Sequence, residues 1–271
     1  MIGNKKQEAG DNSIQVVSEQ GNVNITQGIT FDEIEKVFLT LFEANFPKLV
    51  KEANDEALKN IKEMLDMLKE KIEINKEKID ILKISSPNIQ YNLNKTMLNV
   101  GRKGKDIDTE MLTDTLISFF QNNQNDVYDL VLETTLDLIP RMTKSGILYL
   151  SMIYFYYYAI FDIKDTPVKN IFEEFETVFK INFEISTSEV LYLEQLGCIT
   201  QEKIIRNGAR LKQQLENGYK IDYDDNAYFN MINEKLETNN MNQVFLTPVG
   251  WVIALLNLSK FYKNLNMKAG F

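Results

Sequence analysis

The sequence lacks histidine altogether and contains one cysteine, Cys198. Without histidine there is no Ser-His-Asp or Cys-His pair, no histidine general base and no histidine-ligated metal. A single thiol forms neither an intrachain disulfide nor a zinc site built from several thiolates. Because Cys198 follows a glycine in an apolar run, we interpret it as a buried small hydrophobe rather than a nucleophile. We expect no metal and no cofactor.

Glycine and proline are also scarce, at 12 and 5 residues of 271. This scarcity favours long helices over sandwiches and barrels. The apolar stretch at residues 146–161 has 16 residues without a charge, which is short of the roughly 18–20 that a membrane-spanning helix needs. The N-terminus has no apolar secretory segment. Together with the lone thiol, this predicts a cytoplasmic protein.

The charge balance is acidic, with a formal net charge of -9. Such a charge opposes non-specific nucleic-acid binding by the whole surface. No phosphate-binding loop, dinucleotide-binding or α/β-hydrolase motif is present in the sequence. We therefore expect a protein that is not an enzyme, and only carboxylate, lysine or tyrosine chemistry stays open as an alternative.

The first 28 residues show a β pattern. Apolar residues alternate on both sides of a Glu-Gln-Gly-Asn turn, at Ile14, Val16, Val23 and Ile25, which predicts a hairpin. An isolated hairpin is only marginally stable in water. It must pack on the rest of the chain or pair its edges with other chains. These four residues are therefore the candidates for oligomerisation or docking.

A helical pattern follows the hairpin. The strongest pattern predicts one amphipathic helix over 48–83, about 50 Å long. Its stripe has a period nearer 3.6 than 3.5, which favours a bundle over a coiled coil. Capping and breaking residues predict further helices at about 31–45, 88–100, 107–122, 125–140, 144–162 and 168–181.

The C-terminal third resembles winged-helix modules. Ser186 and Glu189 form a capping box before a helix that stops at Gly197. A helical pattern over 201–217, a strand over 244–246 and a helix that begins at Thr247-Pro248 follow. An acidic insertion at 216–237 opposes a DNA-reading role. The fold class predicted is mainly α: an N-terminal β-hairpin (1–28), a long-helix bundle (29–181) and a C-terminal winged-helix-like module (182–271).

Two segments have both a structural and a functional interpretation. The aromatic residues Tyr154, Tyr156, Tyr157 and Tyr158 indicate a core helix, with membrane insertion or a ligand-lining wall as alternatives. The basic residues Lys203, Arg206, Arg210 and Lys212 indicate an amphipathic helix with a solvated basic face, and nucleic-acid contact is the alternative.

The N-terminal motifs Gly10-Asp11-Asn12-Ser13 and Gly21-Asn22-Val23-Asn24-Ile25, with the later LEQLG and FLTPVG runs, resemble a group of bacterial proteins. These are uncharacterised cytoplasmic proteins with an N-terminal β tag, some suspected in anti-phage defence. The resemblance implies a β element for self-assembly or docking ahead of a helical sensor or effector body.

The function expected is therefore a non-enzymatic, oligomerising interaction protein, a homo-oligomer with a protein partner that the sequence does not identify. The alternatives are a membrane-acting effector that uses residues 146–161 and a winged-helix nucleic-acid-binding regulator. Neither a membrane nor nucleic acid is the favoured partner.

Overall fold

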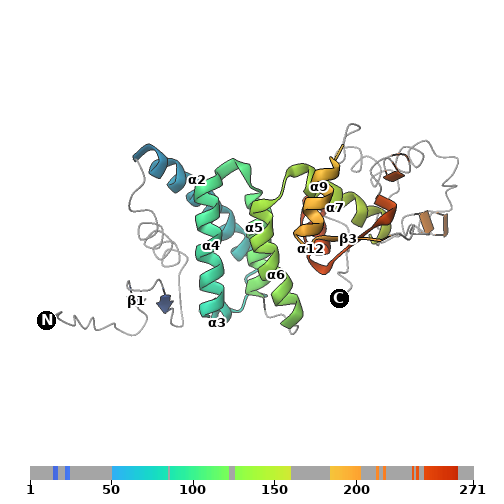
Figure 1. Cartoon of the computed structure of the whole chain (residues 1–271). Coiled ribbons are helices and arrows are strands. Elements are labelled where there is room, and N and C mark those ends of the chain that lie inside the picture. Colours follow the sequence, from blue (N-terminus) through green and yellow to red (C-terminus); the bar gives the residue numbers. More distant parts are fainter. Residues whose placement is uncertain are drawn as a thin grey trace. The chain divides into compact units, whose positions relative to one another are not determined.

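The computed structural model describes residues 15–17, 22–24, 51–84, 86–121, 126–159, 184–202, 212–213, 216–217, 234, 236–237 and 241–261. Most of these residues are helical, which confirms the predicted mainly α fold. The chain forms two compact units, Met1–Pro140 and Arg141–Phe271 (Figure 1). The predicted domain borders at 28 and 181, and the helices predicted at 31–45 and 168–181, lie outside the described residues.

The first unit begins with a two-stranded antiparallel ladder. Strand β1 (Gln15–Val17) pairs with β2 (Asn22–Asn24), so that Val16 lies opposite Val23. Residues 18–21, which connect the strands, lie outside the described residues.

Helix α2 (Lys51–Ile74) has the predicted apolar stripe. Its buried residues are Ala57, Ile61, Met64, Leu65 and Leu68. The prediction of one helix over 48–83 is wrong, because α2 ends at Ile74 and the short helix α3 (Ile81–Ile84) follows a break.

One local contact and two contacts distant in sequence explain the break after α2. The Asn75 side-chain amide donates to the Lys71 carbonyl oxygen at 2.8 Å. Ile79 then pairs with Gln121 in an isolated β-bridge, and the Asp80 amide donates to the Phe120 carbonyl oxygen at 3.0 Å. Ile79 and Asp80 therefore leave the helix and bind the chain at Phe120 and Gln121, where another helix ends.

Three further helices complete the bundle of the first unit. They are α4 (Pro87–Lys103), α5 (Thr109–Phe120) and α6 (Asp126–Leu138), with the short 3₁₀ turns η1 (Gly104–Asp106) and η2 (Ile139–Arg141) after α4 and α6. Helix α2 packs on α4 and α5, and α6 packs on α5 and α4. Strand β2 lies beside α4. Helix α4 extends beyond both ends of its predicted range, 88–100, because Ser86 caps it and Gly101 is helical.

Lysine–aspartate pairs connect these helices. Lys71 pairs with Asp114, Lys83 with Asp129 at 2.7 Å and Lys95 with Asp137 at 2.6 Å. All six side chains keep partial access to solvent, so each pair contributes on the order of 0–1 kcal/mol. Their main effect is to fix which side of each helix faces its neighbour.

The second unit is built around α7 (Lys144–Tyr157) and α12 (Pro248–Ser259), which pack against each other. Nearly every side chain of α7 is buried. The Asn257 amide on α12 donates to the Ser151 hydroxyl on α7 at 2.9 Å, and this bond is buried. A polar pair inside an apolar interface fixes the register of the two helices, because a shift would take the buried Asn257 amide away from the Ser151 hydroxyl.

Helix α9 (Thr187–Gln195) begins with the predicted capping box of Ser186 and Glu189, which is confirmed. The Glu189 carboxylate also accepts hydrogen bonds from the hydroxyls of Ser145 and Thr143 at the start of α7. One carboxylate therefore joins the N-termini of two helices, where negative charge is favourable. The hydrogen bond from Ser145, followed by those from Ser186 and Thr143, lowers the pKa of Glu189.

A second two-stranded ladder pairs β3 (Ile199–Gln201) with β4 (Val244–Leu246). The strand predicted at 244–246 and the helix start at Thr247-Pro248 are confirmed. The helix predicted from 201 is wrong at its first residue, because Gly197, at φ 72°, turns the chain back alongside β4. The winged-helix likeness stays a prediction, since most of residues 203–240 lie outside the described residues.

The start of α12 crosses the Gly197–Cys198 turn at very short range. The Thr247 hydroxyl donates to the Gly197 carbonyl oxygen at 2.6 Å and accepts from the Gly250 amide at 3.2 Å. A Cβ on Gly250 would lie 2.0 Å from the Cys198 carbonyl oxygen. Only glycine fits there without moving backbone, so the LEQLG and FLTPVG motifs form one contact.

We predict that Gly250→Ala lowers the free energy of unfolding of the second unit by about 3 kcal/mol, because the added methyl group collides with backbone. Urea unfolding followed by the fluorescence of Trp251, the single tryptophan, measures this loss. The control is Gly197→Asn, where a Cβ meets nothing within 4 Å and asparagine tolerates the left-handed backbone, at a loss of at most about 1 kcal/mol. Equal losses for the two variants would contradict the account of the crossing.

We predict that Glu189→Gln destabilises the protein in a pH-dependent way. The folded-state pKa lies below the ordinary value of 4.5, so the carboxylate stabilises the fold above that pH and this contribution disappears as the pH falls through the folded pKa. The difference in midpoint temperature between wild type and variant should therefore be largest near pH 7 and shrink below pH 4.5. Glu202→Gln, at an exposed acid of the same unit, is the control, and a pH-independent difference for Glu189→Gln would refute the role of its charge.

Candidate functional site

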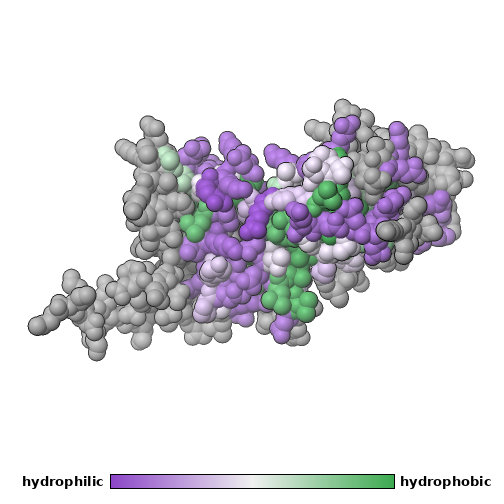
Figure 2. Space-filling model, in the orientation of Figure 1, coloured by the Kyte–Doolittle hydropathy of each residue, from purple (hydrophilic) through white to green (hydrophobic). Residues whose placement is uncertain are grey.

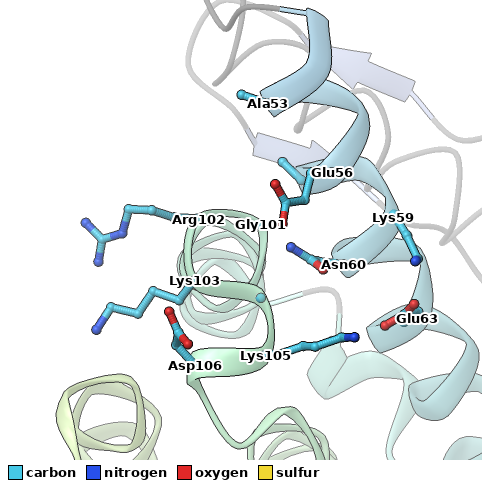
Figure 3. Close-up of a pocket in the computed structure, with 12 residues that line it drawn as sticks. Ala53, Glu56, Lys59, Asn60, Glu63, Gly101, Arg102, Lys103, Lys105 and Asp106 are labelled. Atoms are coloured by element: carbon cyan, nitrogen blue, oxygen red, sulfur yellow. The ribbon is translucent and has the colours of Figure 1, made fainter.

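A pocket of about 510 Å³ lies in the first unit, between α2 and the turn that ends α4 (Figure 3). Charged side chains from both elements line it: Glu56, Lys59, Glu63, Arg102, Lys103, Lys105 and Asp106. Figure 3 shows Glu56 and Asn60 on the side of α2 that faces the turn, while Arg102 extends away from α2. Carboxylates and cations are nearly equal in number here, so the pocket favours neither a cation nor an anion by charge alone.

Two glycines allow the turn to lie close to α2. A Cβ on Gly101 would meet the Ile61 side chain at 3.1 Å, and one on Gly104 would lie 2.6 Å from the Asn60 amide nitrogen. Gly104 also has φ +51°. The basic turn that the sequence shows at 101–105 is therefore partly a packing feature.

Two cations of this turn, Arg102 and Lys103, have structural partners. The Lys103 ammonium donates to the Pro140 carbonyl oxygen at 2.5 Å, and Arg102 donates to the Asn99 side-chain oxygen at 3.3 Å. Within the described ranges, no group of three or more aspartate, glutamate or cysteine side chains is placed to hold a metal ion. The pocket thus offers mixed polar contacts.

The aromatic helix belongs to the core of the second unit. Tyr154, Tyr156 and Tyr157 are buried, and Tyr158 is half-buried. The rings of Tyr154 and Tyr158 lie 5.8 and 4.6 Å from the ring of Trp251 on α12. In the parts of the chain that the structure describes, no helix has the length and apolar character needed to cross a membrane. The burial of Tyr154, Tyr156 and Tyr157 supports the core-helix interpretation of α7.

The lone thiol is buried where β3 begins. Cys198 has no exposed surface, and burial raises the pKa of its thiol to about 12. A thiol with such a pKa holds almost no thiolate near neutral pH, and the thiolate is the reactive form. The residue therefore fits the interpretation as a small core hydrophobe.

The structure describes only part of the other predicted sites. Lys203, Arg206 and Arg210 lie outside the described residues, whereas Lys212 lies 3.7 Å from the Glu216 carboxylate. Ile14 and Ile25 also lie outside them. Val16 and Val23 are register partners in the β1–β2 ladder, so the structure brings the backbone of this pair together.

Sequence reasoning missed an exposed apolar face of the first unit. Val127 and Leu130 on α6 are 61% and 63% exposed, and Tyr91 on α4 is 60% exposed. Figure 2 shows the hydrophobic patch over α6. The sequence does contain a sign of this face, because α6 has more apolar residues than one buried face can hold. Periodicity alone does not show which of these residues remain exposed to solvent.

A protein-family model whose description reads only ":-like" matches residues 28–225. This match covers most of the chain, so the chain belongs to that family. No curated protein and no solved structure matches the chain.

We predict that Cys198 does not react with a thiol reagent such as DTNB in the folded protein at pH 8, because the thiol is buried and its pKa lies near 12. In denaturant, one thiol per chain should react within the mixing time. The rate of colour formation with and without urea is the measurement. Rapid stoichiometric reaction of the native protein would show that the thiol is accessible.

Proposed function

We propose that this chain is a non-enzymatic interaction protein that assembles with copies of itself through its N-terminal ladder, while its helical bundle presents a surface to a partner protein. The observation that carries the proposal is the two-stranded β1–β2 ladder, in which the described residues show no third strand.

The physical reason is the hydrogen bonding of strand edges. Each strand of a two-stranded ladder has one side whose amide and carbonyl groups are not used within the ladder. Such edges pair readily with strands of another chain, and a two-stranded hairpin is only marginally stable alone. Pairing between copies would satisfy these groups and stabilise the ladder at the same time.

The resemblance of residues 10–13 and 21–25 to the tags of bacterial proteins suspected in anti-phage defence suggests a context. In that context, the assembled chain would act as a sensor or effector component.

The two alternatives have less support. The burial of Tyr154, Tyr156 and Tyr157 supports a structural role for α7 over membrane insertion. Glu216 lies beside Lys212 and offsets one charge of the basic segment.

We predict that the double variant Val16→Lys/Val23→Lys lowers the oligomeric mass of the protein to that of a monomer, because two lysines placed opposite each other weaken a ladder that must also pair with sister strands. Light scattering coupled to size-exclusion chromatography measures the mass, and deletion of residues 1–28 should have the same effect. The variant Gln15→Lys/Gln20→Lys, which adds the same two positive charges without a facing lysine pair because Gln15 pairs with Asn24, is the control. A wild-type protein that is monomeric, or an oligomer that survives the deletion, would refute assembly through the ladder.

A further inference from the structure

Helices α4 and α6 form a layer in which both run in the same direction. Asn92 on α4 lies 3.4 Å from Glu133 on α6, and Lys95 lies 2.6 Å from Asp137. Because residue numbers increase together along both helices, the pair is parallel. These contacts also fix the rotation of each helix about its own axis.

That rotation places the exposed apolar side chains on one face. At about 100° per residue, Tyr91 on α4 and Leu130 on α6 point to the same side of the layer. The Lys95 ammonium, which pairs with Asp137 on α6, also lies 5.7 Å from the centre of the Tyr91 ring. Tyr91 therefore borders α6 rather than standing on the far side of α4.

Helix α6 supplies the centre of this face. Val127, Leu130 and Thr134 are all exposed and are spaced at i, i+3 and i+7, the spacing of one helical stripe. Figure 2 shows this hydrophobic patch over α6. We call the set Tyr91, Val127, Leu130 and Thr134 the α4–α6 face. Exposed apolar side chains that lie together in one patch often mark a site of interaction with another molecule, whereas single exposed apolar side chains do not.

The rim of the α4–α6 face is acidic. Helix α6 contains four acidic residues and no basic one: Asp126, Asp129, Glu133 and Asp137. Lys83 and Lys95 pair with Asp129 and Asp137. Glu133 accepts from an uncharged amide, that of Asn92, and Asp126 is exposed. Among the described residues, the charge that remains beside the stripe is therefore negative.

We infer that the α4–α6 face binds an amphipathic helix of a partner protein that has apolar residues at i, i+3 and i+7 and lysine or arginine on its flanks. Charge complementarity favours this occupant. A second copy bound through the same face would place the acids of one α6 against those of the other, which opposes a symmetric dimer. The inference rests on the proposed function, since it names the bundle's partner surface.

The test uses the full chain and two synthetic helical peptides with the same apolar residues, one with lysine flanks and one with glutamate flanks. Fluorescence anisotropy measures binding to each labelled peptide. We expect the lysine peptide to bind about tenfold or more tightly than the glutamate peptide, and to weaken as salt is added. Equal binding of both peptides, or binding of neither, would overturn the inference.

Three variants identify the surface that binds. Val127→Ser/Leu130→Ser should weaken binding of the lysine peptide about tenfold or more. Ile74→Ser, which removes an apolar side chain that is 73% exposed elsewhere in the same unit, should leave it unchanged. Asp126→Asn/Glu133→Gln keeps the stripe and should reduce the preference for lysine over glutamate flanks. If all three variants bind the lysine peptide with the affinity and flank preference of the wild type, the inference is overturned. Circular dichroism confirms that each variant is folded.

Mass measurements separate this inference from the proposed assembly. Deleting residues 1–28 should change the oligomeric mass and leave peptide binding intact. If Val127→Ser/Leu130→Ser instead dissolves the oligomer, the α4–α6 face joins copies of the chain and the inferred partner helix is wrong.

Discussion

The close crossing of α12 over the Gly197–Cys198 turn is the constraint on which the second unit depends. It brings a carbonyl oxygen to a distance from Gly250 that leaves no space for a side chain. Thr247 binds both sides of the crossing, through the Gly197 carbonyl oxygen and the Gly250 amide. Because β4 leads directly into Thr247, the same contact aligns β4 with β3 and sets α12 on α7.

The second unit is organised by packing, and we propose that the first unit serves recognition. In the second unit, aromatic rings and the Ser151–Asn257 hydrogen bond fill the space between α7 and α12, so its most unusual sequence feature is used for packing. In the first unit, the lysine–aspartate pairs orient helices whose apolar residues are not all buried. The remaining apolar residues of α6 lie in an acidic surrounding, which suits a surface that binds another protein.

The sequence predicted those features that depend on neighbouring residues. The capping box at Ser186 and Glu189, the helix start at Thr247-Pro248 and the stripe of α2 are all local patterns, and all are present. The break after Ile74 and strand β3 depend on partners far along the chain, Gln121 and Leu246. Periodicity carries no information about such partners, and it could not show which apolar residues of α6 remain exposed.

Amide hydrogen exchange across the second unit tests most directly whether the crossing organises it. The account predicts that the amides of Thr247 and Gly250 exchange as slowly as those in the middle of α7, and that Gly250→Ala accelerates exchange in α7, β3 and α12 together. Fast exchange at Thr247 and Gly250 alongside a protected α7 would contradict it, because α7 would then be held without the crossing.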